Sequence, residues 1–128
     1  MTERVGEAYE LDEQLTVVGP RLQIGDLAPD FALESFDSAE GAMRTVRLGD
    51  SAGKVRLLNV INSVDTPVCH IETRRWEGLR GDLPSEVVLA TVSMDLPFAL
   101  ARWRDAENAD HEFLSSHKGE DFGRAYGV

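Results

Sequence analysis

The chain has only one cysteine among its 128 residues, Cys69. A single thiol excludes an internal disulfide, a paired Cys-x-x-Cys redox motif and a structural zinc site built from cysteines. A chain without disulfides is typical of the reducing cytoplasm, and that is the location we expect. Any thiol chemistry must therefore be carried out by Cys69 without a second cysteine in the same chain.

Long apolar runs are also lacking. The stretch Val87-Val88-Leu89-Ala90 is among the longest, far below the roughly 18 residues that span a bilayer. The first residues, Met1-Thr2-Glu3-Arg4, are largely polar and show no apolar core of a signal peptide. We therefore expect neither a membrane protein nor a secreted one.

Positive charge is scarce, with 13 Lys and Arg against 23 Asp and Glu and a formal net charge of -10. A nucleic-acid-binding surface needs cations to neutralise phosphates, so this class is excluded. The polar stretch with His111 and His117 shows no paired metal-ligand spacing, and we expect no metal site there. With 42% apolar residues the chain has enough to build the core of one domain.

Two apolar, β-prone runs, residues 55–61 and 86–93, have the composition of strands buried in a parallel sheet. Between them an amphipathic helix is predicted over residues 67–79, where Val68, Ile71, Trp76 and Leu79 repeat at helical spacing. The sequence thus predicts a βαβ unit with a right-handed crossover.

The remaining elements extend this α/β pattern. We expect a loose tail over residues 1–13 and a single α/β domain over residues 14–128. A hairpin is predicted around Gly19-Pro20, with strands at residues 15–18 and 22–24. The other expected elements are strands near residues 31–36, 43–48 and 111–115, a helix with Leu96, Ala99, Trp103 and Ala106 on its apolar face, and a helical turn over residues 120–126.

The loop that leads into the first helix carries the strongest functional signal. Thr66 is predicted as the N-cap, with its hydroxyl accepting from the first-turn N–H groups, and Pro67 as the first helical residue. Cys69 then falls in the first turn, where unpaired N–H groups and the helix dipole favour a thiolate. The alternative is a small buried apolar cysteine. The neighbouring His70 points about 100° away on a helix, which favours a surface position over a role as a base.

Several motifs resemble one protein family. Asp65-Thr66-Pro67-Val68-Cys69 resembles the active-site segment of the thiol peroxidases, the atypical two-cysteine branch of the peroxiredoxins. The segments 25–31, 93–99 and 121–128 agree with that family in order along the chain. The resemblance implies a thioredoxin-like fold with an N-terminal β-hairpin, usually dimeric, that reduces hydroperoxides without a cofactor.

The resemblance also assigns roles to two residues and shows three departures. Cys69 matches the peroxidatic cysteine, and Thr66 matches the threonine that binds the thiolate and the peroxide. The family's signature proline is replaced by Asn62, and its resolving cysteine by Arg104. The family's catalytic arginine would lie after Val128, together with the last strands and helix of the fold. Either the chain is a piece of a longer protein, which is the simpler explanation, or a partner supplies the missing cover.

We therefore expect a thiol peroxidase that uses Cys69 as nucleophile on hydrogen peroxide or organic hydroperoxides. The chain has no second cysteine to resolve the oxidised Cys69. An external thiol, from a thioredoxin-type protein or a small molecule, must then recycle the sulfenic acid. Arg104 is either a compensating charge for Cys69 or, more simply, a solvated surface residue. A homodimer is expected from the resemblance. The competing hypothesis is a catalytically weak thioredoxin-fold domain that senses oxidants or binds a partner.

Overall fold

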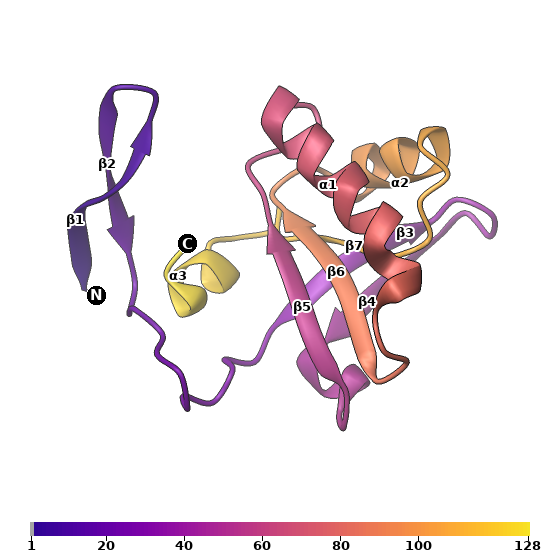
Figure 1. Cartoon of the computed structure of the whole chain (residues 1–128), viewed down its shortest axis with the longest axis horizontal. Coiled ribbons are helices and arrows are strands. Elements are labelled where there is room, and N and C mark those ends of the chain that lie inside the picture. Colours follow the sequence, from indigo (N-terminus) through magenta and orange to yellow (C-terminus); the bar gives the residue numbers. More distant parts are fainter. Residues whose placement is uncertain (1) are drawn as a thin grey trace. The chain divides into compact units, whose positions relative to one another are not determined.

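The structure is a computed structural model that describes residues 2–128, so Met1 of the expected tail lies outside the described residues. The chain divides into two compact units. One comprises Ala32–Lys118, and the other comprises the residues up to Phe31 together with Gly119–Val128. Figure 1 shows the elements of both units along the chain.

The unit Ala32–Lys118 is built on a five-stranded mixed sheet with the strand order β4-β3-β7-β6-β5. The strands β5, β6 and β7 are parallel, and β3 runs antiparallel to both β4 and β7. The strands are β3 (Ala32–Asp37), β4 (Ala42–Arg47), β5 (Val55–Val60), β6 (Val87–Ser93) and β7 (Glu112–Ser115). The predicted pairing of the two apolar runs as adjacent parallel strands is confirmed, since Val55 to Val60 pair with Val87 to Val92 in register.

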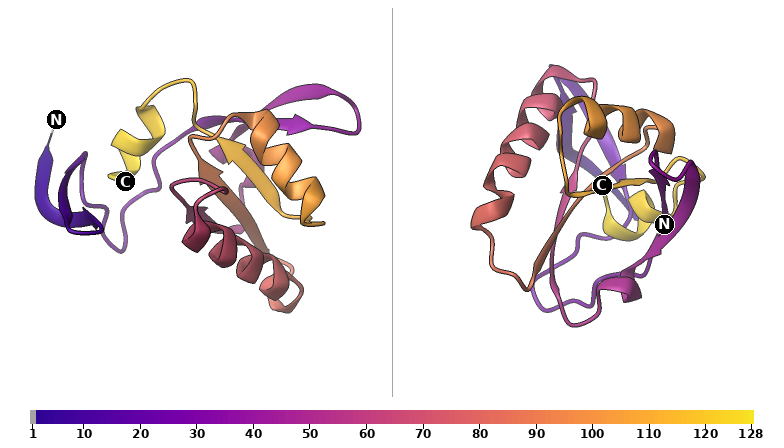
Figure 2. Two further views of the ribbon diagram at one scale, coloured as in Figure 1. Left: turned by 90° about the horizontal axis from the view of Figure 1, so that it is seen from above. Right: turned by 90° about the vertical axis from the view of Figure 1, so that its right-hand side faces the viewer.

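Two helices follow the parallel strands. The helix α1 (Pro67–Leu79) connects β5 to β6, and α2 (Pro97–Ala106) connects β6 to β7. Short 3-10 turns, η1 (Leu48–Ser51) and η2 (Arg80–Asp82), precede β5 and follow α1. Figure 2 shows α1 running alongside β5 and β6. Both helices begin with proline, whose missing N–H has no partner to lose in a first helical turn.

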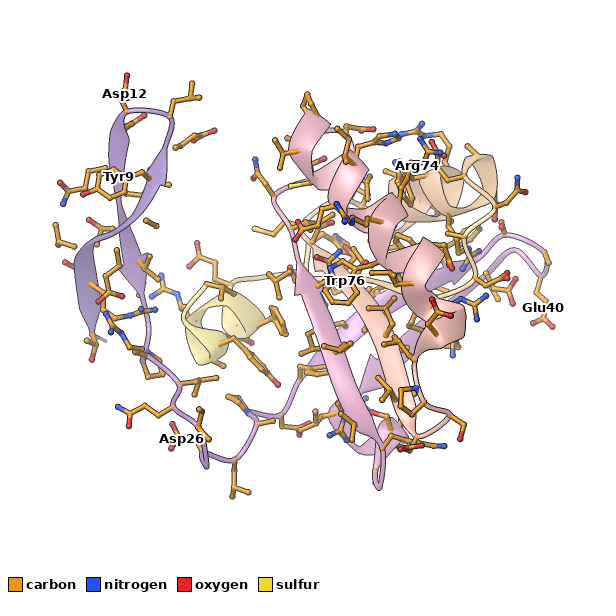
Figure 3. The ribbon with its side chains drawn as sticks, viewed as in Figure 1. Tyr9, Asp12, Asp26, Glu40, Arg74 and Trp76 are labelled. Atoms are coloured by element: carbon orange, nitrogen blue, oxygen red, sulfur yellow. The ribbon has the colours of Figure 1, made fainter. Side chains whose placement is uncertain are left out.

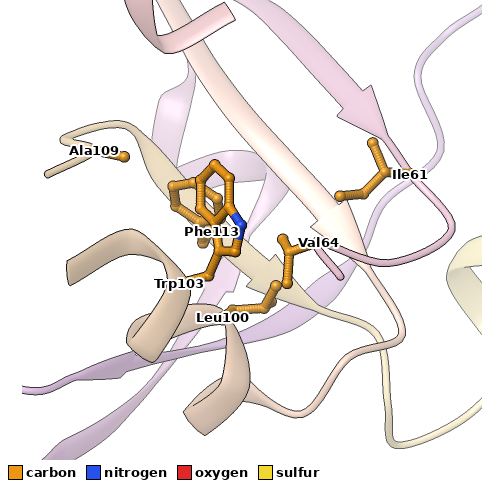
Figure 4. Packing of buried hydrophobic residues seen from close by; sticks show 6 residues of the cluster. All are labelled: Ile61, Val64, Leu100, Trp103, Ala109 and Phe113. Atoms are coloured by element: carbon orange, nitrogen blue, oxygen red, sulfur yellow. The ribbon is translucent and has the colours of Figure 1, made fainter. Parts of the chain in front are cut away.

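The apolar core of this unit lies where α2 meets the sheet and the loop after β5. It consists of six buried residues, which Figure 4 shows packed together: Ile61, Val64, Leu100, Trp103, Ala109 and Phe113. Cys69 packs against this cluster. The first turn of α1 is therefore in contact with the core. Of the apolar face expected for α2, Trp103 is buried at 4% exposure, whereas Leu96 is 55% exposed.

The bounds of α1 agree with the prediction, but most of its apolar stripe is exposed rather than packed on the sheet. Val68 is 75% exposed and Ile71 66% exposed. The buried position is Thr73, whose hydroxyl accepts a hydrogen bond from the amide of Asn59 on β5. Trp76, labelled in Figure 3, borders a cavity of about 320 Å³ between α1 and the sheet. The helical spacing therefore predicted the helix, although a polar contact fixes which face it buries.

The second unit contains the expected N-terminal β-hairpin at a different position. Its strands are β1 (Glu3–Glu10) and β2 (Glu13–Val18), which pair antiparallel. The expectation of a loose tail is thus wrong for residues 3–10, and residues 22–24 form no strand. The reason is that each residue of β2 pairs with a residue of β1. The strand β2 ends before Gly19, whose positive φ of 116° turns the chain away from the extended conformation.

The same unit contains α3 (Asp121–Tyr126), which agrees with the predicted helical turn. The rings of Phe122 and Tyr126 stack, and Phe31 packs against both. Gly19 lies so close to α3 that a Cβ atom there would be 2.1 Å from the carbonyl oxygen of Arg124. The hairpin and α3 are thus joined by a backbone approach that requires glycine.

Candidate functional site

The only thiol of the chain, Cys69, is half-buried in the first turn of α1 and forms no disulfide. Its position follows from the βαβ unit, because the loop after β5 leaves the carboxyl end of a parallel strand and starts α1 at Pro67. This is the edge at which α/β sheets place their ligands. The alternative of a small buried apolar cysteine is met only in part, because Cys69 packs against the core cluster but keeps partial exposure.

Thr66 is the N-cap of α1, as predicted, but its hydroxyl does not cap the helix. Instead, Thr66 Oγ1 donates to the carbonyl oxygen of Ser63 at 2.8 Å. The expectation that this hydroxyl accepts from the first-turn N–H groups is therefore wrong. The physical reason is the tight turn of residues 63–66, in which the N–H of Thr66 also bonds to the Ser63 carbonyl. The Thr66 side chain therefore does not accept a hydrogen bond from any N–H group in the first turn of α1.

The surroundings of Cys69 favour its ionised form. Burial raises the pKa of the Cys69 thiol. Hydrogen bonding from the Thr66 side chain and from the backbone of Ser63 and Asn62 lowers the pKa, and together these bonds outweigh the effect of burial. The carboxylate of Glu72, one turn along α1, acts in the opposite direction by repulsion. The net result is a pKa below the ordinary value of a cysteine. Such a thiol has more thiolate, the reactive form, at neutral pH.

A carboxylate that the sequence reasoning did not single out lies beside this loop. Asp95 lies two residues after the end of β6 and accepts hydrogen bonds from Ser63 Oγ at 2.8 Å and from the backbone N–H of Val64 at 2.9 Å. The position of Asp95 after a predicted strand could have indicated this contact. Because β5 and β6 are parallel neighbours, the residues that follow them meet at one edge of the sheet. The motif that contains Asp95 was recognised as family-like, but its contact with the Cys69 loop was not predicted.

His70 is not a free surface residue. Its Nδ1 accepts the indole N–H of Trp103 at 2.9 Å, and its Nε2 lies 3.7 Å from a carboxylate oxygen of Glu107. Both ring nitrogens thus face partners from α2 and its C-cap. Arg74 reaches the same Glu107 carboxylate at 3.4 Å. This arrangement ties the first turns of α1 to α2 and leaves no described contact through which His70 acts as a base on Cys69.

The arginines near the site have partners of their own. Arg104, at the position of the family's resolving cysteine, lies 3.4 Å from Ser38 Oγ and 3.5 Å from Asp105. Arg102 lies 3.7 Å from Asp65, in the loop before Cys69, and both side chains are about two-thirds exposed. Arg104 is therefore directed toward the turn between β3 and β4. It has no described contact with Cys69.

Metal ligation has little support in the part of the chain that the structure describes. Among residues 2–128, His, Cys, Asp and Glu side chains form no group of three or more that could hold an ion. His111, expected in a polar stretch, is 5% exposed and bound to Glu77 and Thr91.

None of the helices over residues 2–128 is long and apolar enough to cross a membrane.

The chain is similar to known thiol-dependent peroxidases. Residues 24–128 match the AhpC/TSA family. A thiol peroxidase from Listeria monocytogenes is 43% identical over 115 residues, which are 89% of this chain and 66% of that protein. A peroxiredoxin-like protein from Aquifex aeolicus has a similar solved structure, with 30% identity and a TM-score of 0.77 over 91% of this chain and 64% of that one.

A thiol peroxidase from Chromobacterium violaceum is similar in structure, with 27% identity and a TM-score of 0.72. The match covers 91% of this chain and 65% of that one. The chain therefore spans slightly less than two thirds of the length of each of these three proteins.

Proposed function

Because the chain belongs to the AhpC/TSA family of thiol-dependent peroxidases, we propose that it reduces hydroperoxides through the thiolate of Cys69. The α/β fold with an N-terminal hairpin, expected from the sequence, agrees with the peroxiredoxin structures that it resembles. The observation that carries the proposal is the half-buried Cys69, held in the first turn of α1 with its pKa below the ordinary value of a cysteine.

The reaction follows from this position. The Cys69 thiolate attacks one oxygen of the hydroperoxide, a sulfur–oxygen bond forms, and the oxygen–oxygen bond breaks. The sulfur is oxidised to sulfenic acid, and the leaving alkoxide or hydroxide takes up a proton to give an alcohol or water. Thr66 is the second proposed catalytic residue. Its hydroxyl, which already lowers the pKa of the Cys69 thiol by hydrogen bonding, donates to the thiolate and then to the bound peroxide.

Recycling needs a thiol from outside the chain, because Cys69 is its only cysteine. An external thiol condenses with the sulfenic acid to give a mixed disulfide and water, and a second thiol releases reduced Cys69 and an external disulfide. A thioredoxin-type protein or a small thiol fits this role. The contacts of Arg104 with Ser38 and Asp105 argue against a role as a compensating charge for Cys69, although its side chain is only 22% exposed.

A homodimer, located in the cytoplasm, is part of the proposal. Large apolar side chains near the site are exposed, at Val68 and Ile71 on α1, at Met94 and Leu96 between β6 and α2, and at Phe98 in the first turn of α2. A surface of this kind favours association.

The proposed domain organisation is one thioredoxin-like domain over residues 14–128. The single unpaired thiol favours a reducing compartment.

The decisive test is the rate at which Cys69 is oxidised by equimolar hydrogen peroxide, followed by intact-mass spectrometry. We expect sulfenic acid to form faster than on free cysteine at the same pH. Thr66→Val is expected to slow this step by about ten- to a hundredfold, because it removes a hydrogen bond to a charged group. Thr66→Ser keeps the hydroxyl and is the matched control. Oxidation no faster than that of free cysteine would favour a catalytically weak sensing or binding domain.

The recycling route is tested separately under non-reducing conditions. Peroxide alone is expected to give sulfenic and then sulfinic acid on Cys69, and added glutathione is expected to give a mixed disulfide. A quantitative dimer linked through Cys69 of two chains would instead show that a second copy supplies the resolving thiol.

A further inference from the structure

Asp95 joins two connections of the sheet at the edge where Cys69 lies. Its carboxylate accepts the Ser63 hydroxyl on Oδ1 at 2.8 Å, and the Val64 backbone N–H on Oδ2 at 2.9 Å. Oδ2 also accepts the Ser93 hydroxyl at 2.8 Å. Ser93 is the last residue of β6 and is 3% exposed, so one end of this hydrogen-bond network is fixed to the sheet. The other end is the loop between β5 and α1.

Ser63 transmits this contact toward Cys69. Its hydroxyl, which donates to Asp95, also accepts the backbone N–H of Asp65 at 3.1 Å. Its carbonyl accepts the Thr66 hydroxyl at 2.8 Å. Val64, the other residue bound by Asp95, is fully buried in the core cluster. The turn before α1 is thus held by its own bonds to Ser63, by the Asp95 carboxylate and by the buried Val64 side chain.

The same turn supplies the groups that act on the sulfur. Hydrogen bonding from the Thr66 side chain and the backbone of Ser63 and Asn62 opposes the effect of burial on the pKa of Cys69. Such contacts act only at hydrogen-bonding distance and with good alignment, so a small shift of the turn weakens them. We propose that Asp95 is a positioning residue that holds the Asn62–Thr66 loop in the arrangement required for a reactive Cys69.

The charges around Cys69 allow this role to be separated from simple electrostatics. The carboxylate of Glu72, also on α1, disfavours the Cys69 thiolate by repulsion. Asp65 in the loop lies near Arg102 of α2. His70 accepts from Trp103, and Arg74 lies near Glu107. Asp95 itself carries a negative charge, so removing that charge without moving the loop favours the thiolate. Loss of positioning has the opposite effect. The two roles therefore predict changes of opposite sign.

The test compares Asp95→Asn with the wild-type chain in the pH dependence of Cys69 alkylation by iodoacetamide, followed by intact mass. The variant keeps the shape of the side chain but replaces one acceptor oxygen with a donor group that faces other donors. We expect the alkylation profile to move to higher pH and the rate at pH 7 to fall about three- to tenfold. Asp65→Asn, the matched control, removes one charge from the same loop and is expected to leave the rate at least as high as in the wild type.

A second variant keeps the test independent of the charge and of the stability of Asp95→Asn. Ser63→Ala removes the bond to Oδ1 and leaves the carboxylate in place, so its profile must also move to higher pH. A profile that is unchanged in Ser63→Ala, or that moves to lower pH in Asp95→Asn, overturns the positioning role.

The proposal rests on Cys69 as the reacting thiol, but alkylation involves no peroxide. The two ideas therefore fail in different ways. A wild-type profile equal to that of free cysteine contradicts the proposed function, whereas a low wild-type profile that both variants retain contradicts only the role of Asp95.

Discussion

The carboxylate of Glu77 in the last turn of α1 accepts a hydrogen bond from the buried ring of His111, with 3.2 Å between Oε1 and Nδ1. The same oxygen accepts the backbone N–H of His111 at 3.0 Å and that of Asp110. On its other side, the His111 ring lies with Nε2 2.7 Å from Thr91 Oγ1. The C-terminal end of α1 is thereby attached to the segment that leads into β7.

Replacing Glu77 with Gln is expected to destabilise the protein at pH 7 by about 2 kcal/mol, because hydrogen bonds to a charged group are lost. Burial raises the pKa of Glu77, but hydrogen bonds from Arg80, Asp110 and His111 lower it by more. The net effect takes the pKa from 4.5 to about 2. The carboxylate therefore stabilises the fold above pH 4.5, and this stabilisation, on the order of 3 kcal/mol at most, is lost as the pH falls toward 2.

Urea unfolding at a series of pH values checks this prediction. The Glu77→Gln chain should lack the part of the acid-induced loss that the wild type shows below pH 4.5. Glu72→Gln, an exposed position on the same helix, is the control and should retain it. An identical pH dependence in the wild type and in Glu77→Gln would contradict the assignment.

His111 produces a second effect at higher pH. Burial lowers the pKa of His111 more than the Glu77 carboxylate raises it, so the folded state favours the neutral ring. The stabilisation is therefore complete above the ordinary value of 6.5 and is lost as the pH falls below it. Between pH 7 and 5.5, the free energy of unfolding should fall more steeply in the wild type than in His111→Gln. Equal slopes in a urea titration would refute this.

Two leucines near α2 test the extent of the core. Leu100 is 1% exposed, and its replacement by Ala is expected to lower the free energy of unfolding by about 2–5 kcal/mol. Leu96, the N-cap residue of the same helix, is 55% exposed, and Leu96→Ala is expected to change it by no more than about 0.5 kcal/mol. Urea unfolding of the two variants gives the comparison, and similar losses would place the core elsewhere.

Gly19 is expected to tolerate no side chain. In Gly19→Ala the new Cβ meets the Arg124 carbonyl at 2.1 Å, at a φ of 116° that L-residues rarely adopt. Gly25→Ala is the matched control, since its φ of 96° is similarly unfavourable but its Cβ meets no atom within 4 Å. Amide hydrogen exchange in β1 and β2 should accelerate more in the first variant by at least about tenfold, equivalent to about 1.4 kcal/mol of local stability. Equal acceleration would show that the approach to α3 is unimportant.

The sequence predicted the parts of the fold that depend on local patterns. The strands β5 and β6, with α1 between them, follow from two apolar runs and from Pro67, and their parallel pairing follows from the βαβ connection. The strand β1 was missed because residues 3–10 are rich in acids and show little alternation. Its strand conformation depends on pairing with β2, which no local pattern reveals.

The candidate site shows the same division. The position of Cys69 in the first helical turn could be predicted because it depends only on where the helix begins. The contacts of Asp95 with Ser63 and Val64 join residues about 30 positions apart, and so they require the sheet register. The hydroxyl of Thr66 was predicted to cap α1, yet a carbonyl three residues earlier competes for its proton. Short polar side chains choose between such partners according to the backbone geometry of the loop.

The bond from the Trp103 indole to His70 gives the protein an internal optical reporter. The two rings meet edge to face at a centroid distance of 5.4 Å, and His70 is the residue after Cys69 in the same helical turn. Any rearrangement of that turn, for example on oxidation or alkylation of Cys69, changes the polarity and quenching around this indole. Trp76 is the only other tryptophan, so a Trp76→Phe chain emits from a single site. Its fluorescence then follows the chemistry of the neighbouring sulfur in real time, without an attached dye.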